Sequence, residues 1–395
     1  MTTTIVFVDD EPNVLEGTRR SLRRMGESWD LLFFDDPHAA LDHIRTNAVD
    51  VVVSDMRMPD MDGAQLLGEV KRANPSAARM ILSGYSDGDA VLRSTRVAHQ
   101  FLTKPCEPDE LRQALEKIDE ARSAVPLTAI REIVGSVDQL PSVGEVFEEL
   151  TARTATDDYS IDSLGQIVVR DVGLSAELFR LVNTSFFGLR RQIESVSEAI
   201  SFLGVDVLLG IVAAHSVLRS DEFTSADRIT RLNSHSQATA SLAARYRRLE
   251  GGTNRQSIEA FTAGLLHEVG ALVLVRLGTF PPDQVWTVLD EDDWMNERMQ
   301  FGADRFSVGS YLLGLWGFSP DTVRAVAALG SDDPIADPTG LDGALTVAHH
   351  ALVSGRISMT DALADESDGM DAVDDALREV AAELTEHGMA GPPLV

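Results

Sequence analysis

The sequence is poor in cysteine, in lysine and in long apolar segments. Cys106 is the only cysteine, so the chain cannot form an internal disulfide, which fits a reducing cytoplasm. No uninterrupted apolar run reaches the roughly 18 residues of a membrane-spanning helix. The first residues also lack the basic and then apolar segments of a signal peptide. These absences predict a cytoplasmic protein without a membrane segment.

Positive charge is scarce as well. The formal net charge is −29, and lysine occurs only at positions 71, 104 and 117. Binding to a nucleic-acid backbone requires clustered Lys and Arg, so this composition argues against a nucleic-acid partner. The rest is ordinary globular material, 44% hydrophobic and 25% charged, and 395 residues are enough for two or three domains.

One uninterrupted β-branched run ends at an acid. The valines at 51–53 lead through Ser54 to Asp55. Such a run is typical of a strand buried on both faces of a parallel sheet. Ligands of these sheets bind beyond the carboxyl ends of the strands. We therefore expect Asp55 to act as a nucleophile, a metal ligand or both.

Residues 4–122 alternate between short apolar segments and amphipathic ones. The predicted strands cover 4–8, 31–34, 51–55, 79–82 and 100–103. The predicted helices cover a segment that begins at Pro12, then 38–45, 63–72, 87–97 and 108–122. Five strand–helix units predict an α/β doubly wound parallel sheet, (βα)5, whose strand ends meet at one edge.

Five polar side chains are expected at this edge. They are Asp9, Asp10, Asp55, Ser83 and Lys104. Three carboxylates repel one another unless a divalent cation lies between them, and a few oxygen ligands favour Mg²⁺. A hydroxyl and an ammonium group beside them would hold phosphoryl oxygens. The set predicts phosphoryl transfer to Asp55.

The motifs around these residues resemble those of a response-regulator receiver domain. They are Asp9-Asp10, Asp55 with Met58-Pro59 and Asp62-Gly63, Ser83-Gly84, and Phe101 with Lys104-Pro105. The resemblance covers residues 4–122. It implies that this part of the chain is phosphorylated in two-component signalling.

The resemblance also implies a role for each residue. Asp55 would accept the phosphoryl group, and Ser83 and Lys104 would bind it. Mg²⁺ would be held by Asp10, Asp55, the backbone carbonyl of Arg57 and, through water, Asp9. Phe101 occupies the aromatic switch position, and the Lys104-Pro105 peptide is a candidate for the cis form.

Residues 123–127 break the alternation and are predicted to be a linker. Helical periodicity follows, with predicted core helices at 173–187, 205–218, 260–277, 306–315 and 344–353. Predicted helix starts are the capping boxes at 142–145 and 195–198, Ser160, and Ser319-Pro320. We predict an all-α domain over 128–354, followed by a weakly attached acidic helix and tail over 355–395.

Two passages of this region resemble the HDOD domain, a relative of the HD phosphohydrolases. One comprises residues 171–188 with 200–204, and the other is 261–270, which contains His267-Glu268. Leu140-Pro141 also fits. HD hydrolases bind metal through a His, a His-Asp pair and a later Asp. The resemblance therefore directs attention to the histidines of this half.

The metal-binding pattern is incomplete. His235 and His267 could be the first two ligands, but Glu268 replaces the usual Asp. His349-His350 falls where the last acid would be and is left unassigned, and His215 is assigned to the core. The sequence favours a non-catalytic output domain. The alternative is a metal-dependent phosphohydrolase of a nucleotide second messenger, with a weak site at His235, His267 and Glu268.

Together these observations predict a cytoplasmic response regulator. A sensor histidine kinase would phosphorylate Asp55 with Mg²⁺, and this would control an HDOD domain that binds an unidentified protein partner. The sequence leaves open a homodimer and a scaffold that works without phosphorylation. Neither a nucleic acid nor a membrane is expected as a partner.

Overall fold

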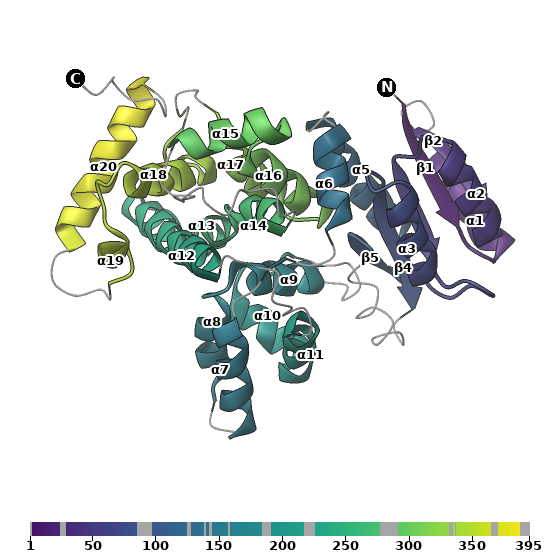
Figure 1. Cartoon of the computed structure of the whole chain (residues 1–395), viewed down its shortest axis with the longest axis horizontal. Coiled ribbons are helices and arrows are strands. Elements are labelled where there is room, and N and C mark those ends of the chain that lie inside the picture. Colours follow the sequence, from purple (N-terminus) through teal and green to yellow (C-terminus); the bar gives the residue numbers. More distant parts are fainter. Residues whose placement is uncertain are drawn as a thin grey trace. The chain divides into compact units, whose positions relative to one another are not determined.

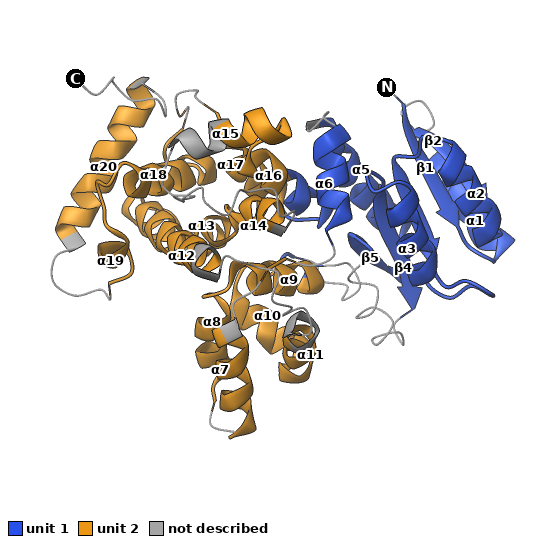
Figure 2. Cartoon of the chain, viewed as in Figure 1, with its two compact units in different colours: residues 1–139, 183–192, 311–318 blue, residues 140–182, 193–310, 319–395 orange. Residues whose placement is uncertain are grey.

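The computed structural model describes residues 2–23, 29–84, 97–124, 128–137, 140–141, 144–156, 159–183, 191–216, 226–276, 291–331, 335, 337–364 and 370–387. The chain forms two compact units, coloured separately in Figure 2. Unit 1 comprises residues 1–139, 183–192 and 311–318, and unit 2 comprises 140–182, 193–310 and 319–395.

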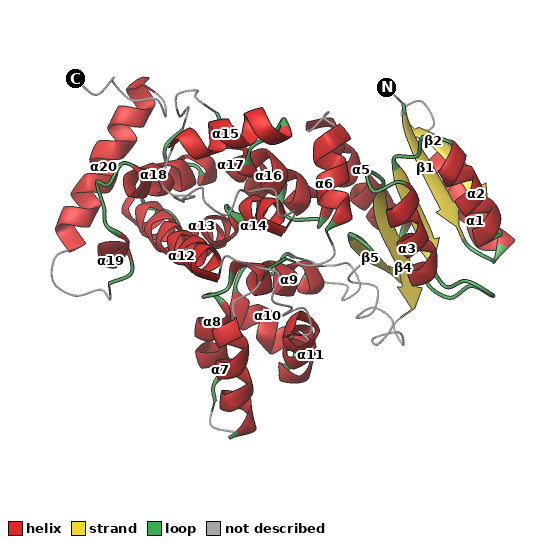
Figure 3. Ribbon diagram, viewed as in Figure 1, coloured by secondary structure: helices red, strands yellow, loops and turns green. Residues whose placement is uncertain are grey.

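Unit 1 contains a five-stranded sheet, yellow in Figure 3, and Figure 1 labels its strands except β3. Its strands are β1 (Thr3–Val8), β2 (Trp29–Phe34), β3 (Val51–Asp55), β4 (Ala78–Gly84) and β5 (Gln100–Lys104). The order is β2-β1-β3-β4-β5 and every pair is parallel. The predicted doubly wound α/β fold is confirmed.

The helices of this region are α1 (Pro12–Leu22), α2 (Pro37–Thr46), α3 (Gly63–Ala73), α5 (Pro108–Ala124) and α6 (Thr128–Ser136). Helix α2 packs beside α3 and helix α1 beside α5. The helix predicted at 87–97 lies outside the described residues, apart from Val97, which is in a turn. All five residues of β3 are buried, as its unbroken β-branched sequence predicts.

The loop from β3 to α3 is defined by an N-cap and a close backbone approach. Asp62 and Gln65 form a reciprocal capping box that starts α3 at Gly63. A Cβ atom on Gly63 would lie 2.2 Å from the carbonyl oxygen of Asp55. Only glycine lets this loop fold back onto the end of β3.

In the described residues of the rest of the chain, all regular secondary structure is helical. The elements are α7 (Gly144–Ala155), α8 (Ile161–Val168), α9 (Val172–Val182), α10 (Val196–Leu203), α11 (Val205–Ser216), α12 (Ala226–Leu249), α13 (Asn254–Leu266), α14 (Val269–Arg276), α15 (Glu291–Phe301), α16 (Arg305–Leu315), α17 (Pro320–Ala328), α18 (Leu341–Val353), α19 (Met359–Ala362) and α20 (Met370–His387). This confirms the predicted helical second half.

The predicted caps at Ser160, Ser195 and Ser319 are present, since each side chain accepts a backbone N–H three residues ahead. The cap predicted at Ser142 lies outside the described residues. So do the side chain of His215 and residues 184–190.

Two helix predictions were wrong in extent. The segment predicted as one helix over 260–277 is two helices, α13 and α14, separated at His267 and Glu268. The helix predicted over 173–187 ends at Val182. Periodicity alone misses such breaks, because both sides of each break are apolar.

Residues Asn254–Val275 pass the length and composition test for a membrane span, at a mean hydropathy of 1.6, but 83% of the tested window is buried inside the protein. The segment is therefore part of the core of unit 2.

One further expectation needs correction. Helix α20 is not weakly attached. Its apolar stripe packs into a core with residues of α12 and α18, and Val373, Leu377, Val380, Ala381 and Leu384 are buried.

Candidate functional site

The first candidate site lies at the carboxyl edge of the sheet. Strands β1 and β3 are neighbours with Val8 opposite Ser54, so Asp9 and Asp55 emerge side by side. The chain connections diverge between these two strands, which is where open α/β sheets bind ligands. Lys104 ends β5 and donates to Asp9 Oδ2 over 2.6 Å. Its ammonium group also forms an ion pair with Asp55.

The three charged groups are largely shielded from water. Asp9 is 3% exposed, Asp55 is 7% exposed, and the side chain of Lys104 is 27% exposed. Burial raises the pKa of Asp55, although the hydrogen bond and charge of Lys104 act against this rise. Burial lowers the pKa of Lys104, but hydrogen bonds to Asp55 and Asp9 outweigh it, and the net shift is upward. Lys104 is therefore a permanent counter-charge for the two acids.

The structure brings other predicted residues close to Asp55. The backbone N–H of Arg57 donates to Asp55 Oδ2 over 2.7 Å, which orients the carboxylate. Ser83 is buried at the end of β4, one residue beyond Leu82, which lies opposite Asp55. Lys104-Pro105 is cis, as predicted.

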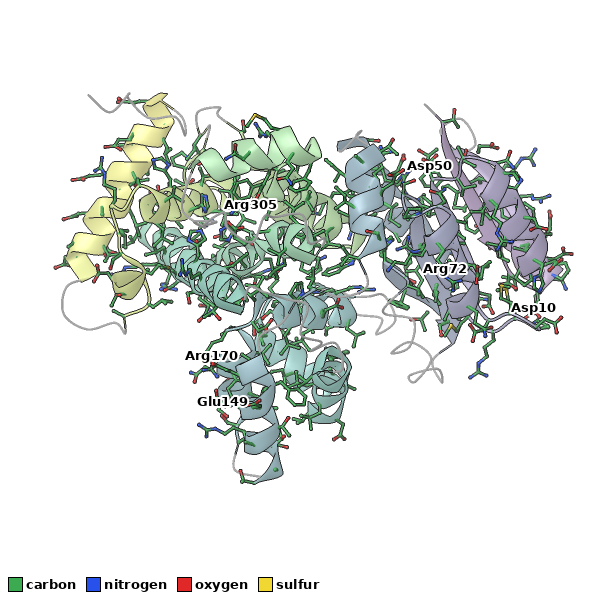
Figure 4. The ribbon with its side chains drawn as sticks, viewed as in Figure 1. Asp10, Asp50, Arg72, Glu149, Arg170 and Arg305 are labelled. Carbon is green, nitrogen blue, oxygen red and sulfur yellow. The ribbon has the colours of Figure 1, made fainter. Side chains whose placement is uncertain are left out.

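Two predicted residues, Asp10 and Phe101, are not part of the ion-paired group of Asp9, Asp55 and Lys104. Asp10 is only partly buried, lies at the strand ends in Figure 4, and forms no ion pair with another residue in the described part of the chain. Phe101 is 1% exposed and packs in the core cluster that also contains Ile81.

The donor set at this edge suits a hard cation. Asp9 and Asp55 supply buried carboxylate oxygens, with Asp10 adjacent in sequence and Lys104 the counter-charge that holds both acids. Carboxylates and backbone carbonyls with room for water are the ligands that Mg²⁺ prefers. The residues present therefore fit this ion.

A second cluster lies inside unit 2. His235 comes from α12, His267 and Glu268 from the break between α13 and α14, and His349 from α18. One ligand atom from each of the four lies within 4.8 Å of every other. All four residues are buried, with His349 the most exposed at 6%. Sequence reasoning proposed the first three and missed His349.

The three imidazole rings converge on one point. His235 Nε2 lies 3.2 Å from His349 Nδ1, and that atom lies 3.3 Å from His267 Nε2. The ring centroids are 5.1–5.2 Å apart. Burial lowers the pKa of His267 to about 4 and lowers the pKa values of His235 and His349 well below 6.5. At neutral pH the rings are uncharged.

Close packing of two helices positions this cluster. A Cβ atom on Gly264 of α13 would lie 2.5 Å from the Cα of Ala240 on α12, so glycine lets the two backbones touch. The same turn of α13 supplies the carbonyl of Gly264 to His267 Nδ1 at 2.6 Å. The helix crossing therefore places α13 against α12, and the Gly264 carbonyl orients the His267 ring.

An arginine and a second acid border the cluster. Arg305, labelled in Figure 4, contacts Glu268 at 3.5 Å and Glu297 at 2.7 Å. Burial raises the pKa of Glu268, and the charge of Arg305 opposes this rise. Glu297 also accepts from Arg305 Nε and from the Arg305 backbone N–H, so it is the stronger partner of the guanidinium.

His349 could have been found from helical periodicity. It lies four residues after Leu345 and three before Leu352, and all three are buried on α18. His350 is only partly buried. The apolar spacing therefore separates the two histidines that the sequence prediction left unassigned.

Comparisons with known families agree with both halves of the fold. Residues 5–116 match the family model of the response regulator receiver domain, and residues 140–330 match that of the HDOD domain.

Individual relatives match parts of the chain. The transcriptional regulatory protein GlrR of Escherichia coli is 31% identical over 163 residues, 41% of this chain and 36% of the relative. The DNA-binding transcriptional regulator NtrC of Klebsiella pneumoniae is 34% identical over 118 residues, 30% of this chain and 24% of the relative. This chain thus spans about a third or less of these curated relatives.

Solved structures also match. The MmoQ response regulator of Methylococcus capsulatus is 24% identical, with a TM-score of 0.47, over 64% of this chain and 95% of that one. A response regulator receiver domain protein from Clostridium thermocellum is 31% identical, with a TM-score of 0.27, over 29% of this chain and 91% of that one.

Proposed function

Because the chain belongs to the response regulator receiver family over residues 5–116 and to the HDOD family over 140–330, we propose that phosphorylation of Asp55 controls its HDOD domain. The chain acts in signal transduction, and a receiver domain implies a cognate histidine kinase. The observation that carries the proposal is the buried group of Asp9, Asp55 and Lys104 at the point where the chain connections diverge.

The reaction is transfer of a phosphoryl group from a kinase histidine. A carboxylate oxygen of Asp55 forms the new bond to phosphorus, the phosphorus–nitrogen bond breaks, and the imidazole keeps the electron pair and takes up a proton. The N–H of Arg57 orients the carboxylate, and Lys104 moves its ammonium group onto the incoming oxygens. Mg²⁺, held by Asp10, Asp55, the Arg57 carbonyl and, through water, Asp9, would neutralise charge on the phosphoryl group.

A change at Asp55 alters the partners of Lys104. In the unphosphorylated chain the ammonium group binds two carboxylates. Once one of them carries a phosphoryl group, the lysine, the Ser83 hydroxyl and the strands behind them, with Phe101 on β5, move to a second packing. This is a population shift between two states of one domain.

The output is a non-catalytic HDOD domain that binds a protein partner. The histidine cluster supports this, because its four residues are buried inside unit 2. The alternative, a metal-dependent phosphohydrolase, needs an open coordination position for water. The proposed location is the cytoplasm, and neither a nucleic acid nor a membrane is a proposed partner.

The proposed domain boundaries are residue 122 for the receiver, 123–127 for the linker, 128–354 for the HDOD domain and 355–395 for the acidic end. Helix α6, although it follows the linker, is hydrogen-bonded within unit 1. Arg79 Nη2 donates to the carbonyl of Gly135 over 2.9 Å, and Lys71 donates to that of Val137 over 3.0 Å. Limited proteolysis tests these limits. First cleavage within 123–127 would support them, whereas first cleavage within 138–143 would move the boundary to the far side of α6.

Phosphate uptake from acetyl phosphate tests the assignment of Asp55. The full chain with Mg²⁺ should incorporate phosphate, and Asp55→Asn or a chelator should abolish it. Asp60→Asn is the matched control, because the same amide replaces an exposed acid at φ 65°, a conformation that Asn accepts. Labelling of Asp55→Asn at the parental level would refute the proposal.

Partner capture tests the output. The full chain is used as bait with and without beryllofluoride, which mimics the acyl phosphate, and Asp55→Asn serves as the reference. Capture that depends on beryllofluoride only in the parent chain supports control by Asp55. Equal capture in all arms would favour a scaffold that works without phosphorylation. Light scattering in the same arms measures whether the chain forms a homodimer.

A further inference from the structure

In the histidine cluster of unit 2, no placement of protons on the three neutral rings gives every ring nitrogen a hydrogen-bond partner. The tautomer of His267 is fixed by its neighbour, because His267 Nδ1 lies 2.6 Å from the carbonyl oxygen of Gly264 and must donate to it. In a neutral ring the other nitrogen, Nε2, then carries a lone pair. That lone pair faces His349 Nδ1 at 3.3 Å.

His349 Nδ1 cannot satisfy both of its neighbours. It lies 3.2 Å from His235 Nε2 and 3.3 Å from His267 Nε2, and it has either one proton or one lone pair. If it accepts from His235, two lone pairs face each other across the contact with His267. If it donates, a single proton is shared between two acceptors. His235 Nδ1 must then carry a proton, although it has no partner among the described residues.

The carboxylate beside the rings does not solve this problem. Glu268 Oε1 lies 3.7 Å from His267 Nε2, which is beyond hydrogen-bond distance. The same oxygen is buried and has no hydrogen-bond partner in the described part of the chain. Its other oxygen contacts Arg305 at 3.5 Å. An orphaned acceptor therefore lies next to converging nitrogen lone pairs.

A cation at the centre would satisfy all of these atoms. Zinc–nitrogen bonds of about 2.0–2.1 Å in a tetrahedron place neighbouring ligand atoms about 3.3–3.4 Å apart. The observed nitrogen separations are 3.2 and 3.3 Å. The Nδ1–H···O=C bond of His267 is also the arrangement that orients a metal-binding histidine. The side chains are thus already spaced as a ligand set.

We propose that His235, His267, His349 and Glu268 bind one transition-metal ion, with Zn²⁺ as the best fit, in a closed four-coordinate site. Imidazole ligands select ions such as Zn²⁺ over Mg²⁺. Glu297 largely neutralises Arg305, which leaves the charge of Glu268 for the ion.

A closed site is structural rather than hydrolytic. The four ligands come from α12, from the break between α13 and α14, and from α18, so the ion would clamp these segments together. Four protein ligands leave no open position for a reactive water. The role is stabilisation of the HDOD domain, and it is independent of phosphorylation at Asp55.

Metal analysis of the full chain tests this site. We expect one equivalent of Zn²⁺ per chain after equilibration with the ion and removal of excess, and a thermal transition that falls when the ion is chelated. Cobalt should replace it and give the intense visible absorption of tetrahedral Co²⁺. His349→Gln should weaken Zn²⁺ binding by more than about 100-fold. His350→Gln, the adjacent histidine on the same helix, should bind like the parent.

A second variant covers failure of His349→Gln to fold. His349→Cys retains a ligand, so it should bind cobalt and add a sulfur-to-metal charge-transfer band that the parent lacks. The proposal is overturned if the parent chain binds less than a tenth of an equivalent, if His349→Gln binds as tightly as the parent, or if His349→Cys binds cobalt without the new band. Octahedral, weakly absorbing cobalt or metal-dependent phosphohydrolase activity would overturn the closed geometry. Phosphate uptake at Asp55 should not change in any arm.

Discussion

Replacing Lys104 with methionine tests the charge group at the sheet edge. Lys104 Nζ lies 2.6 Å from Asp9 Oδ2 and also pairs with Asp55, and both acids are less than a tenth exposed. Methionine keeps most of the side-chain volume but removes the positive charge. Two buried carboxylates would then face each other without a counter-ion, which destabilises the folded domain.

The size of the effect follows from the geometry. At 2.6 Å and an effective dielectric constant of about 20, one such ion pair is worth about 6 kcal/mol before desolvation is subtracted. Removing one partner of a buried pair typically costs about 3–5 kcal/mol. The Lys104 side chain is 27% exposed, so we expect the lower end, about 3 kcal/mol, in metal-free buffer. Mg²⁺ at 100 times its dissociation constant would return about 2.7 kcal/mol.

Hydrogen exchange of the β3 amides measures this loss directly, because these amides exchange only when the core of the sheet opens. The parent and Lys104→Met are compared in a chelator and in Mg²⁺. Lys117→Met is the matched control, since burial lowers the pKa of Lys117 and its loss should change the opening free energy by less than about 1 kcal/mol. Parental protection of Lys104→Met in the chelator would refute the reasoning. An equal increase in opening free energy on adding Mg²⁺ to the parent and to Lys104→Met would also refute it.

Three further predictions use differential measurements. Gly63→Ala should lower the free energy of unfolding by about 2–4 kcal/mol in denaturant, because its Cβ would meet the backbone at the end of β3. The control Gly17→Ala has open space around it in α1 and should raise the free energy of unfolding by about 0.5–1 kcal/mol. Equal effects of the two substitutions would contradict this prediction. Arg79→Met should cost about 2–4 kcal/mol and increase exchange in α6, because it leaves buried carbonyls unpaired, whereas the exposed Arg72→Met should cost less than about 0.5 kcal/mol. Burial and neighbouring acids raise the pKa of Cys106 to about 11, so only about 0.1% is thiolate at pH 8. Alkylation should therefore accelerate about tenfold per pH unit up to pH 10, and a plateau below pH 9 would disprove the shift.

The sheet-edge site was largely predictable because parallel topology converts sequence order into position. Strands β1, β3, β4 and β5 each end at or next to a recognisable polar residue, and these ends meet at one edge. Sequence reasoning therefore placed Asp55 with Asp9 and Lys104. It could not tell that Asp9, rather than Asp10, pairs with the lysine, because both residues follow the end of β1 and the course of the backbone there is not encoded in the motif. The functional roles of these residues stay predictions.

The helical site was less predictable for a physical reason. A helix pattern identifies a buried face but not the helix that covers it, so His349 could be assigned to a core and not to His235 and His267. The separation of α13 from α14 was hidden because apolar residues continue through His267-Glu268 on both sides. The burial of α20 was hidden by its acidic outer face, although its apolar residues recur with helical spacing.

Helix α6 is fastened to the receiver and does not merely follow it. The guanidinium of Arg79 bonds to the carbonyls of Val97, Ala77 and Gly135. Any displacement of β4 would therefore move the C-terminal end of α6 with it, so that the strand and the helix shift as one rigid body. The first segment that could move independently of the receiver would then lie after Val137. A receiver fragment that stops at residue 122 would lack α6, and the Arg79 guanidinium would lose the carbonyl of Gly135 as a partner.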